Sequence, residues 1–199
     1  TASPAPAVAP AAQTPAAAAD AAPRNTIIVF DGSGSMWGRI DGDRQAKFVV
    51  VRETLRKSLA APPPGTRLGM LSFGYRRQAD CADVGVLAPL DALTADTMTE
   101  RIMTPLERIN PKGKGPLTAA IREAARTIGR TAGPRSLVVV HDGLDNCGLN
   151  PCDAVTEYKE AAPGVAIHVL AIGLDEDDAK KYQCLATATG GTHHEARTA

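Results

Sequence analysis

Short apolar runs alternate along this chain with segments whose apolar residues recur at helical spacing, and this alternation limits the available folds. Strand-like runs cover residues 26–31, 67–73, 84–90, 135–141, 165–172 and 192–196. Helical spacing covers residues 43–60, 94–109, 117–128, 153–161 and 177–188. The alternation predicts an α/β fold with a doubly wound, mostly parallel central sheet and helices on both faces. A short connection predicts that the second and third strands are antiparallel, which gives one antiparallel edge strand.

The first 23 residues differ in composition from the rest. They contain 12 Ala, 5 Pro and a single charged residue, Asp20. Regularly placed prolines exclude a continuous helix, and such a segment has little to bury. We therefore expect a disordered tether over residues 1–23 and one folded domain over residues 24–199.

The bulk composition excludes several classes of function. The formal net charge is zero and aromatic residues make up 4% of the chain, which disfavours nucleic-acid binding. The longest apolar stretch, residues 165–172, is interrupted by His168 and is far too short to span a bilayer. We expect that this chain does not insert directly into a membrane.

Oxygen-bearing side chains follow the first predicted strand at alternate positions. Asp31, Ser33 and Ser35 are separated by two glycines, which allow the backbone to turn sharply so that the three side chains converge. Carboxylate and hydroxyl oxygens suit Mg²⁺. Asp142 follows the strand at 135–141, and ligands of doubly wound sheets bind at such carboxyl ends. These residues therefore predict a cation site.

The order of motifs resembles the von Willebrand factor type A (VWA) family, bacterial extracytoplasmic type. The resemblance rests on residues 31–36, 113–121, 137–143 and 189–191 and covers the whole folded part. It implies the VWA fold and a metal-ion-dependent adhesion site formed by Asp31, Ser33, Ser35 and Asp142. It further implies a bound Mg²⁺ (or Mn²⁺ or Ca²⁺), whose open position accepts an acidic side chain of a partner protein. The implied role is protein binding, not catalysis.

The chain departs from the family pattern at one ligand. Alignment of Pro116-Leu117 with the family's Pro-Leu places Gly115 where the family has a metal-binding threonine. Thr118 lies one helical turn further on and is not expected to replace it. We predict weaker metal binding than in an intact site.

Residues at the periphery of the site have two interpretations each. Trp37 is either an exposed contact residue or a cover for the core, and Asp145 either supports the metal distantly or caps a turn. The basic residues Arg76, Arg77, Lys112 and Lys114 either form a rim that attracts an acidic partner or are an ordinary solvated surface.

The four cysteines Cys81, Cys147, Cys152 and Cys184 show no zinc-site spacing. Their even number, together with the Ala/Pro segment, favours disulfides and a periplasmic or secreted location. Three pairings are available. Cys147 and Cys152 can close a small loop, which leaves Cys81 and Cys184 as the second pair; the alternative is four buried free thiols.

Two functions compete with metal-assisted binding. A structural interaction domain with a degenerate metal site is the first. A hydrolase that uses Ser33 or Ser35 as nucleophile and His141 as base is the second, although neither serine lies in a Gly-x-Ser-x-Gly turn. A packed, hydrogen-bonded histidine is the alternative for His141.

Overall fold

A six-stranded sheet forms the centre of the computed structural model, which describes residues 24–42 and 44–197. The strand order is β3-β2-β1-β4-β5-β6, and β3 alone runs antiparallel to its neighbour. The strands are β1 (Arg24–Asp31), β2 (Thr66–Phe73), β3 (Val84–Ala92), β4 (Arg135–His141), β5 (Ala166–Ile172) and β6 (His193–Ala196). The predicted fold class, antiparallel edge strand included, is confirmed. The predicted tether, residues 1–23, lies outside the described residues.

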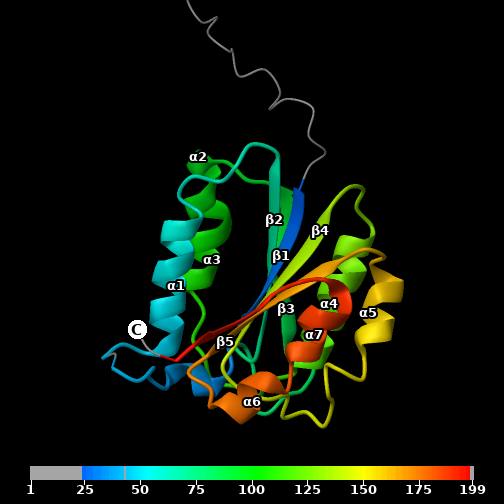
Figure 1. Cartoon of the computed structure of the whole chain (residues 1–199). Helices are drawn as coiled ribbons and strands as arrows, with labels where there is room; N and C mark the ends of the chain where they lie inside the picture. Colours follow the sequence, from blue (N-terminus) through cyan, green and yellow to red (C-terminus); the bar gives the residue numbers. More distant parts are fainter. Residues whose placement is uncertain (1–23, 43, 198–199) are drawn as a thin grey trace, which may run out of the picture.

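Helices cover both faces of the sheet (Figure 1). One face carries α1 (Lys47–Ser58), α2 (Ala95–Met98) and α3 (Thr104–Glu107), and the other carries α4 (Leu117–Gly129), α5 (Val155–Ala161) and α7 (Gln183–Thr189). The short α6 (Glu176–Lys180) lies at the end of the molecule where the parallel strands stop. In the described part of the chain, no helix has the length and apolar character needed to cross a membrane.

Two predicted helices are interrupted. The segment predicted at 94–109 contains a π-helical turn, η2 (Thr99–Met103), between α2 and α3. Pro105 stands at the start of α3; it lacks an N–H group and its ring would crowd the preceding turn of a regular helix. The segment predicted at 177–188 divides into α6 and α7.

The central strands are buried on both faces and hold the site rigidly. In β1, Ile27 and Val29 pack beneath α4, whereas Ile28 and Phe30 face the α1 side. This alternation follows from the two-residue period of a strand. Phe30 pairs with Val140 of β4, so the ends of β1 and β4 lie next to each other. The register therefore brings the residues that follow these strands into one place.

The disulfide pairing suggested by sequence spacing is wrong. Cys81 is bonded to Cys147 and Cys152 to Cys184, with Cα–Cα distances of 5.7 and 5.8 Å. The reason is the strand order: β2 and β4 both flank β1, so the loops after them meet at the same edge of the sheet. Spatial proximity between loops, not the four-residue spacing, decides the partners. The alternative of four free thiols is contradicted.

Peptide mapping checks this pairing. Cleavage after Leu149 by chymotrypsin separates Cys147 from Cys152, and Leu149 is exposed. Under non-reducing conditions, mass spectrometry should find the Cys147 peptide joined to the Cys81 peptide and the Cys152 peptide joined to the Cys184 peptide. A joined Cys147–Cys152 pair would contradict the structure.

Candidate functional site

The loop after β1 turns three oxygen-bearing side chains toward one point. The backbone N–H of Ser33 donates to Asp31 Oδ1 at 2.7 Å, and the 3-10 turn η1 (Gly34–Trp37) follows directly. The hydroxyls of Ser33 and Ser35 are hydrogen-bonded at 3.0 Å. Gly32 permits this path, because a Cβ there would lie 2.8 Å from the carbonyl oxygen of Phe73. The glycine is needed for the close approach of the loop to β2.

Asp142 joins this loop from the end of β4. The Ser35 hydroxyl donates to Asp142 Oδ1 at 2.6 Å, and the backbone N–H of Asp142 donates to Asp31 Oδ2 at 3.3 Å. The four residues predicted from the sequence therefore lie together, although 111 positions separate Asp31 from Asp142. Their role as metal ligands stays a prediction.

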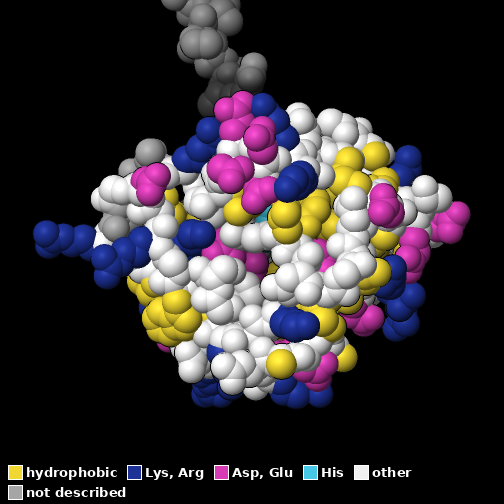
Figure 2. All heavy atoms as spheres, turned by 90° about the horizontal axis from the view of Figure 1, so that it is seen from below, with side chains coloured by type: hydrophobic (Ala, Val, Ile, Leu, Met, Phe, Trp, Pro, Cys, Tyr) yellow, Lys and Arg dark blue, Asp and Glu magenta, His cyan; other side chains and the backbone are white. Residues whose placement is uncertain are grey.

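A small cavity opens at this cluster. Its volume is about 190 Å³, and its lining residues come from the ends of β1 and β2, the loops after β1 and β4, and the start of α4 with the loop before it. They are Asp31, Ser33, Ser35, Phe73, Gly115, Leu117, Gly143, Leu144 and Asn146. Figure 2 looks onto this end of the molecule and shows charged side chains of both signs spread over it. The cavity is large enough for a cation with coordinated water.

Lys47 contacts the cluster, and the sequence analysis missed this contact. Its ammonium group lies 3.1 Å from Asp142 Oδ2, and both side chains are almost fully buried. Gly173 makes room for it, because a Cβ at Gly173 would lie 2.8 Å from Lys47 Cε. The helix predicted from the sequence began at residue 43, whereas in the structure Lys47 stands in the first turn of α1, where a positive charge opposes the helix dipole. Such a residue needs a reason, and here the reason is a buried carboxylate.

The cluster holds more negative charge than its surroundings neutralise. The pKa of Asp31 is raised to about 7, first because burial disfavours the charged carboxylate and second because the charge of Asp142 repels it. Lys47 supplies one positive charge against the two carboxylates. A further cation at this place would therefore stabilise the site.

The sequence matches the family model for the von Willebrand factor type A domain over residues 25–197. The chain belongs to the VWA family. Two relatives are known from Bacillus subtilis (strain 168): YwmC is 25% identical over 184 residues, covering 89% of this chain and 78% of YwmC. YwmD is 20% identical over 192 residues, covering 92% of this chain and 83% of YwmD.

Solved VWA structures share the fold of this VWA domain. The pilus adhesin SpaC from Lactobacillus rhamnosus GG superposes with a TM-score of 0.69 at 14% identity, over 90% of this chain and 29% of SpaC. A von Willebrand factor type A protein from Catenulispora acidiphila gives 0.68 at 19% identity, over 89% and 39%. Mussel byssus PTMP1 with a zinc-occupied metal-ion-dependent adhesion site gives 0.57 at 15% identity, over 88% and 44%. The chain thus spans less than half the length of these three proteins.

The residue set of the VWA domain fits a hard divalent cation. Asp31, Ser33 and Ser35 line the cavity, and the buried carboxylate of Asp142 contacts Ser35 next to it, so hard oxygen atoms dominate the polar side chains here. Within residues 24–42 and 44–197, no group of three or more His, Cys, Asp or Glu side chains is arranged to hold a metal. A site built from two carboxylates and two hydroxyls does not require such a group.

Gly115 lines the cavity, whereas Thr118 does not. The side chain of Thr118 is buried, and its hydroxyl has no hydrogen-bond partner in the described structure. Its backbone N–H donates to Asp145 Oδ2 at 2.8 Å, so Asp145 satisfies the start of α4 from a neighbouring loop. Thr118 thus stands apart from the cavity, and Asp145 holds the start of α4; the expectation that Thr118 does not replace the missing threonine stays a prediction.

Trp37 packs on the core and is half exposed, so its predicted role as a contact residue stays a prediction. The indole N–H donates to the carbonyl of Pro111 at 2.7 Å, and the ring meets Phe48 edge-on at 4.5 Å between centroids. Yet 52% of the residue is exposed. It thus covers part of the core and also presents an apolar surface near the site.

The rim arginines are already paired. Arg76 Nε lies 2.6 Å from Asp83 Oδ1, and Arg77 lies 2.6 Å from Asp80. These pairs reduce the positive charge that the sequence suggested at this edge. The remaining positive charge of the predicted rim belongs to Lys112 and Lys114.

The arrangement does not favour a serine hydrolase. His141 is buried, and its Nδ1 is hydrogen-bonded to the carbonyl oxygen of Gly143 at 3.0 Å. Burial lowers the pKa of His141. The serine hydroxyls bond to each other and to Asp142. His141 is thus packed as a structural residue, in line with the alternative given for it.

Replacement of Lys47 by methionine tests the charge balance. Lys47→Met leaves Asp142 buried without its ammonium partner, which should cost roughly 3–5 kcal/mol of stability in EDTA. Saturating Mg²⁺ should recover more stability in the variant than in the parent, because the cation then meets an uncompensated charge. Urea unfolding with and without Mg²⁺ measures both effects.

Lys57→Met serves as the control, because Lys57 is exposed on the same helix. An equal loss of stability in EDTA and in Mg²⁺ for Lys47→Met would show that Lys47 has no influence on a cation.

Proposed function

We propose that this VWA domain binds a divalent cation through Asp31, Ser33, Ser35 and Asp142, and binds a carboxylate of a partner protein through that cation. The observation that carries the proposal is that these four side chains, from two distant segments, form one hydrogen-bonded cluster, three members of which line a cavity. Mg²⁺ is the favoured ion, with Mn²⁺ and Ca²⁺ as close alternatives, since all donors are hard oxygens.

The chain's own residues would position the cation and leave its positive charge available to an incoming carboxylate. The hydroxyls of Ser33 and Ser35 are neutral ligands, so they do not cancel the charge of the ion. The ammonium group of Lys47 offsets the negative charge of Asp142, whereas a further carboxylate would add to that charge. A bound Mg²⁺ would supply an electrophilic centre for an incoming carboxylate oxygen. Binding, not bond cleavage, is the chemistry that this arrangement supports.

The comparisons support a binding role. SpaC, which shares the fold, is a pilus adhesin, and PTMP1 has a zinc-occupied site of the kind proposed here. Two disulfides fit a periplasmic or secreted location, where oxidised cysteines persist. We extend both the adhesive role and this location to the present chain as proposals.

A metal-free interaction domain is the second candidate, favoured by one observation. The ammonium of Lys47 already contacts Asp142, so the cluster contains an internal cation. If the charge of Lys47 alone is enough to stabilise the cluster, the domain binds its partner through another surface, and EDTA does not change partner binding.

Acetate can serve as a minimal carboxylate probe. With Mn²⁺ bound, the parent protein should broaden the carboxyl ¹³C resonance of added acetate through the paramagnetic ion. After gel filtration has removed unbound Mn²⁺, Ser33→Ala and Asp142→Ala should show no such broadening, because each substitution removes a ligand. Ser136→Ala, at the opposite end of β4, should leave it unchanged. Broadening that persists in both site variants would contradict the proposed site.

Restoration of the missing hydroxyl gives a second test. Gly115 has room for a side chain, since a Cβ would meet its nearest neighbour, the carbonyl oxygen of Leu144, at 3.7 Å. Gly115→Thr should tighten Mg²⁺ binding up to roughly tenfold, because a tethered hydroxyl replaces a water that must be immobilised. Isothermal titration calorimetry measures this. Gly115→Ala adds the Cβ without the oxygen, and equal gains in both variants would exclude the hydroxyl as the cause.

A further inference from the structure

The absence of threonine at position 115 leaves space in the wall of the cavity, and a different side chain borders that space. Asn146 lines the same cavity as Asp31, Ser33 and Ser35. Its Oδ1 lies 3.9 Å from the position that a Cβ on Gly115 would take. A threonine hydroxyl stands one bond beyond its Cβ, so the Asn146 oxygen borders the place where the family's ligand would be.

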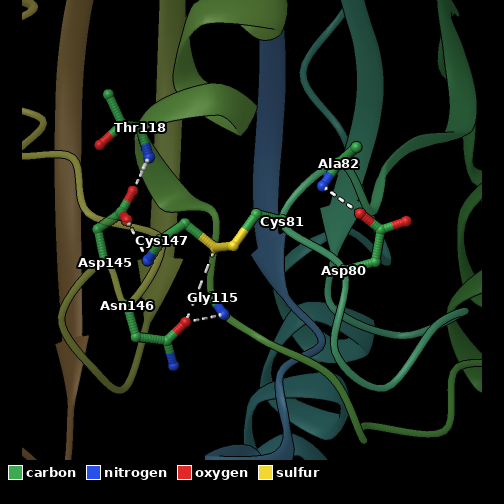
Figure 3. The surroundings of a disulfide bond; sticks show 8 residues. All are labelled: Asp80, Cys81, Ala82, Gly115, Thr118, Asp145, Asn146 and Cys147. Carbon is green, nitrogen blue, oxygen red and sulfur yellow. Dashed lines mark hydrogen bonds between the residues drawn. A yellow bond between two sulfur atoms is a disulfide. The ribbon is translucent and has the colours of Figure 1, made fainter.

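The orientation of the Asn146 carboxamide follows from its hydrogen bonds. The backbone N–H of Gly115 donates to Asn146 Oδ1 at 2.8 Å, and the backbone N–H of Asn146 donates to the carbonyl of Gly115 at 3.4 Å (Figure 3). Because a donor faces it, the atom next to Gly115 must be the carbonyl oxygen and not the NH₂ group. The Sγ of Cys147 lies 3.9 Å from the same oxygen, but it belongs to a disulfide and has no proton to donate. One of the two lone pairs of the carbonyl oxygen therefore stays available for a cation.

The covalent framework fixes Asn146 in this place. The next residue, Cys147, is bonded to Cys81 in the loop between β2 and β3. The preceding residue, Asp145, accepts the N–H of Cys147 at 2.9 Å and the N–H of Thr118 at 2.8 Å. Figure 3 shows these contacts around the disulfide, with Asn146 and Gly115 facing each other. The side chain is therefore held in position before any ligand arrives.

We propose that Asn146 supplies the neutral side-chain oxygen that the threonine supplies elsewhere in the family. This inference rests on the proposed metal-binding function. Asn carbonyl oxygens are ordinary ligands of hard divalent cations. The exchange moves the donor from the start of α4 to the loop after β4 and keeps it uncharged, so the number of carboxylates at the site is unchanged.

Mn²⁺ alone is the probe for the test, with affinity measured by the loss of the free-ion electron paramagnetic resonance signal. Asn146→Ala should weaken Mn²⁺ binding at least about tenfold, the usual range for removal of a supporting residue at a metal site. Asn150→Ala is the matched control, because Asn150 makes a similar local bond to the N–H of Cys152 but does not line the cavity.

A structural role for Asn146, limited to its bond with Gly115, must be separated from a ligand role. Gly115→Thr in the Asn146→Ala background should restore affinity close to that of the parent, and its gain there should exceed its gain in the parent. Electron–nuclear double resonance on protein with ¹³C-labelled Asn carboxamides should show a strong coupling to Mn²⁺ that Asn146→Ala abolishes. Equal gains from Gly115→Thr in both backgrounds, or no such coupling, would overturn the inference.

The two proposals fail in different ways. If the parent does not bind Mn²⁺, or binds it equally well after Ser33→Ala, the proposed function itself is wrong. If the parent binds Mn²⁺ through Ser33 but Asn146→Ala binds it equally well, the metal site stands and the role of Asn146 is wrong.

Discussion

The burial of two carboxylates side by side is the constraint on which this site depends. Asp31 and Asp142 lose most of their contact with water, and a charge removed from water is costly unless it is paired and hydrogen-bonded. The protein meets part of that cost with backbone N–H groups, with the Ser35 hydroxyl and with the ammonium of Lys47. These contacts do not offset the whole cost of burial, because the pKa of Asp31 is still raised to about 7. A place that is rigid, oxygen-lined and short of positive charge is suited to hold a cation.

The sheet holds the two buried carboxylates together at the ends of β1 and β4. β1 and β4 are neighbours buried on both faces, so the residues that follow them cannot separate without disrupting two hydrophobic clusters. Strand order also brings the loops after β2 and β4 together, and the Cys81–Cys147 disulfide joins them covalently. Stability thus comes from the core and the crosslink, which leaves the carboxylates free to serve binding at a local cost.

The sequence predicted those parts of the site that depend on periodicity and local motif. Apolar runs located the strands, and the position of Asp31 and Asp142 directly after two of them was enough to place both at one edge. The pairing of the cysteines was not predictable in this way, because it depends on which loops the strand order makes adjacent. Cys147 and Cys152 are close in sequence, yet each pairs with a residue from a different loop or helix.

Lys47 and Asn146 escaped sequence analysis for a related reason. Each acts on the site across a tertiary contact: Lys47 from the start of α1, 95 positions from Asp142, and Asn146 across 31 positions from Gly115. Neither belongs to the motif that identifies the family. The helix predicted from the sequence began at residue 43, so the place of Lys47 at the helix start was not visible, and nothing in the sequence around Asn146 indicated that this residue lines the cavity.

Charge balance connects these two residues with the proposed partner. Lys47 offsets one of the two carboxylates, so the metal-free cluster carries a single net negative charge when both are ionised. A divalent cation reverses that sign, and the neutral oxygens of Ser33, Ser35 and Asn146 leave it reversed. One carboxylate from outside then brings the buried cluster to neutrality. A further acidic ligand within the chain would remove the need for that outside carboxylate. In the proposed function, the electrostatic preference for an acidic partner would therefore come from the combination of an internal lysine with uncharged ligands.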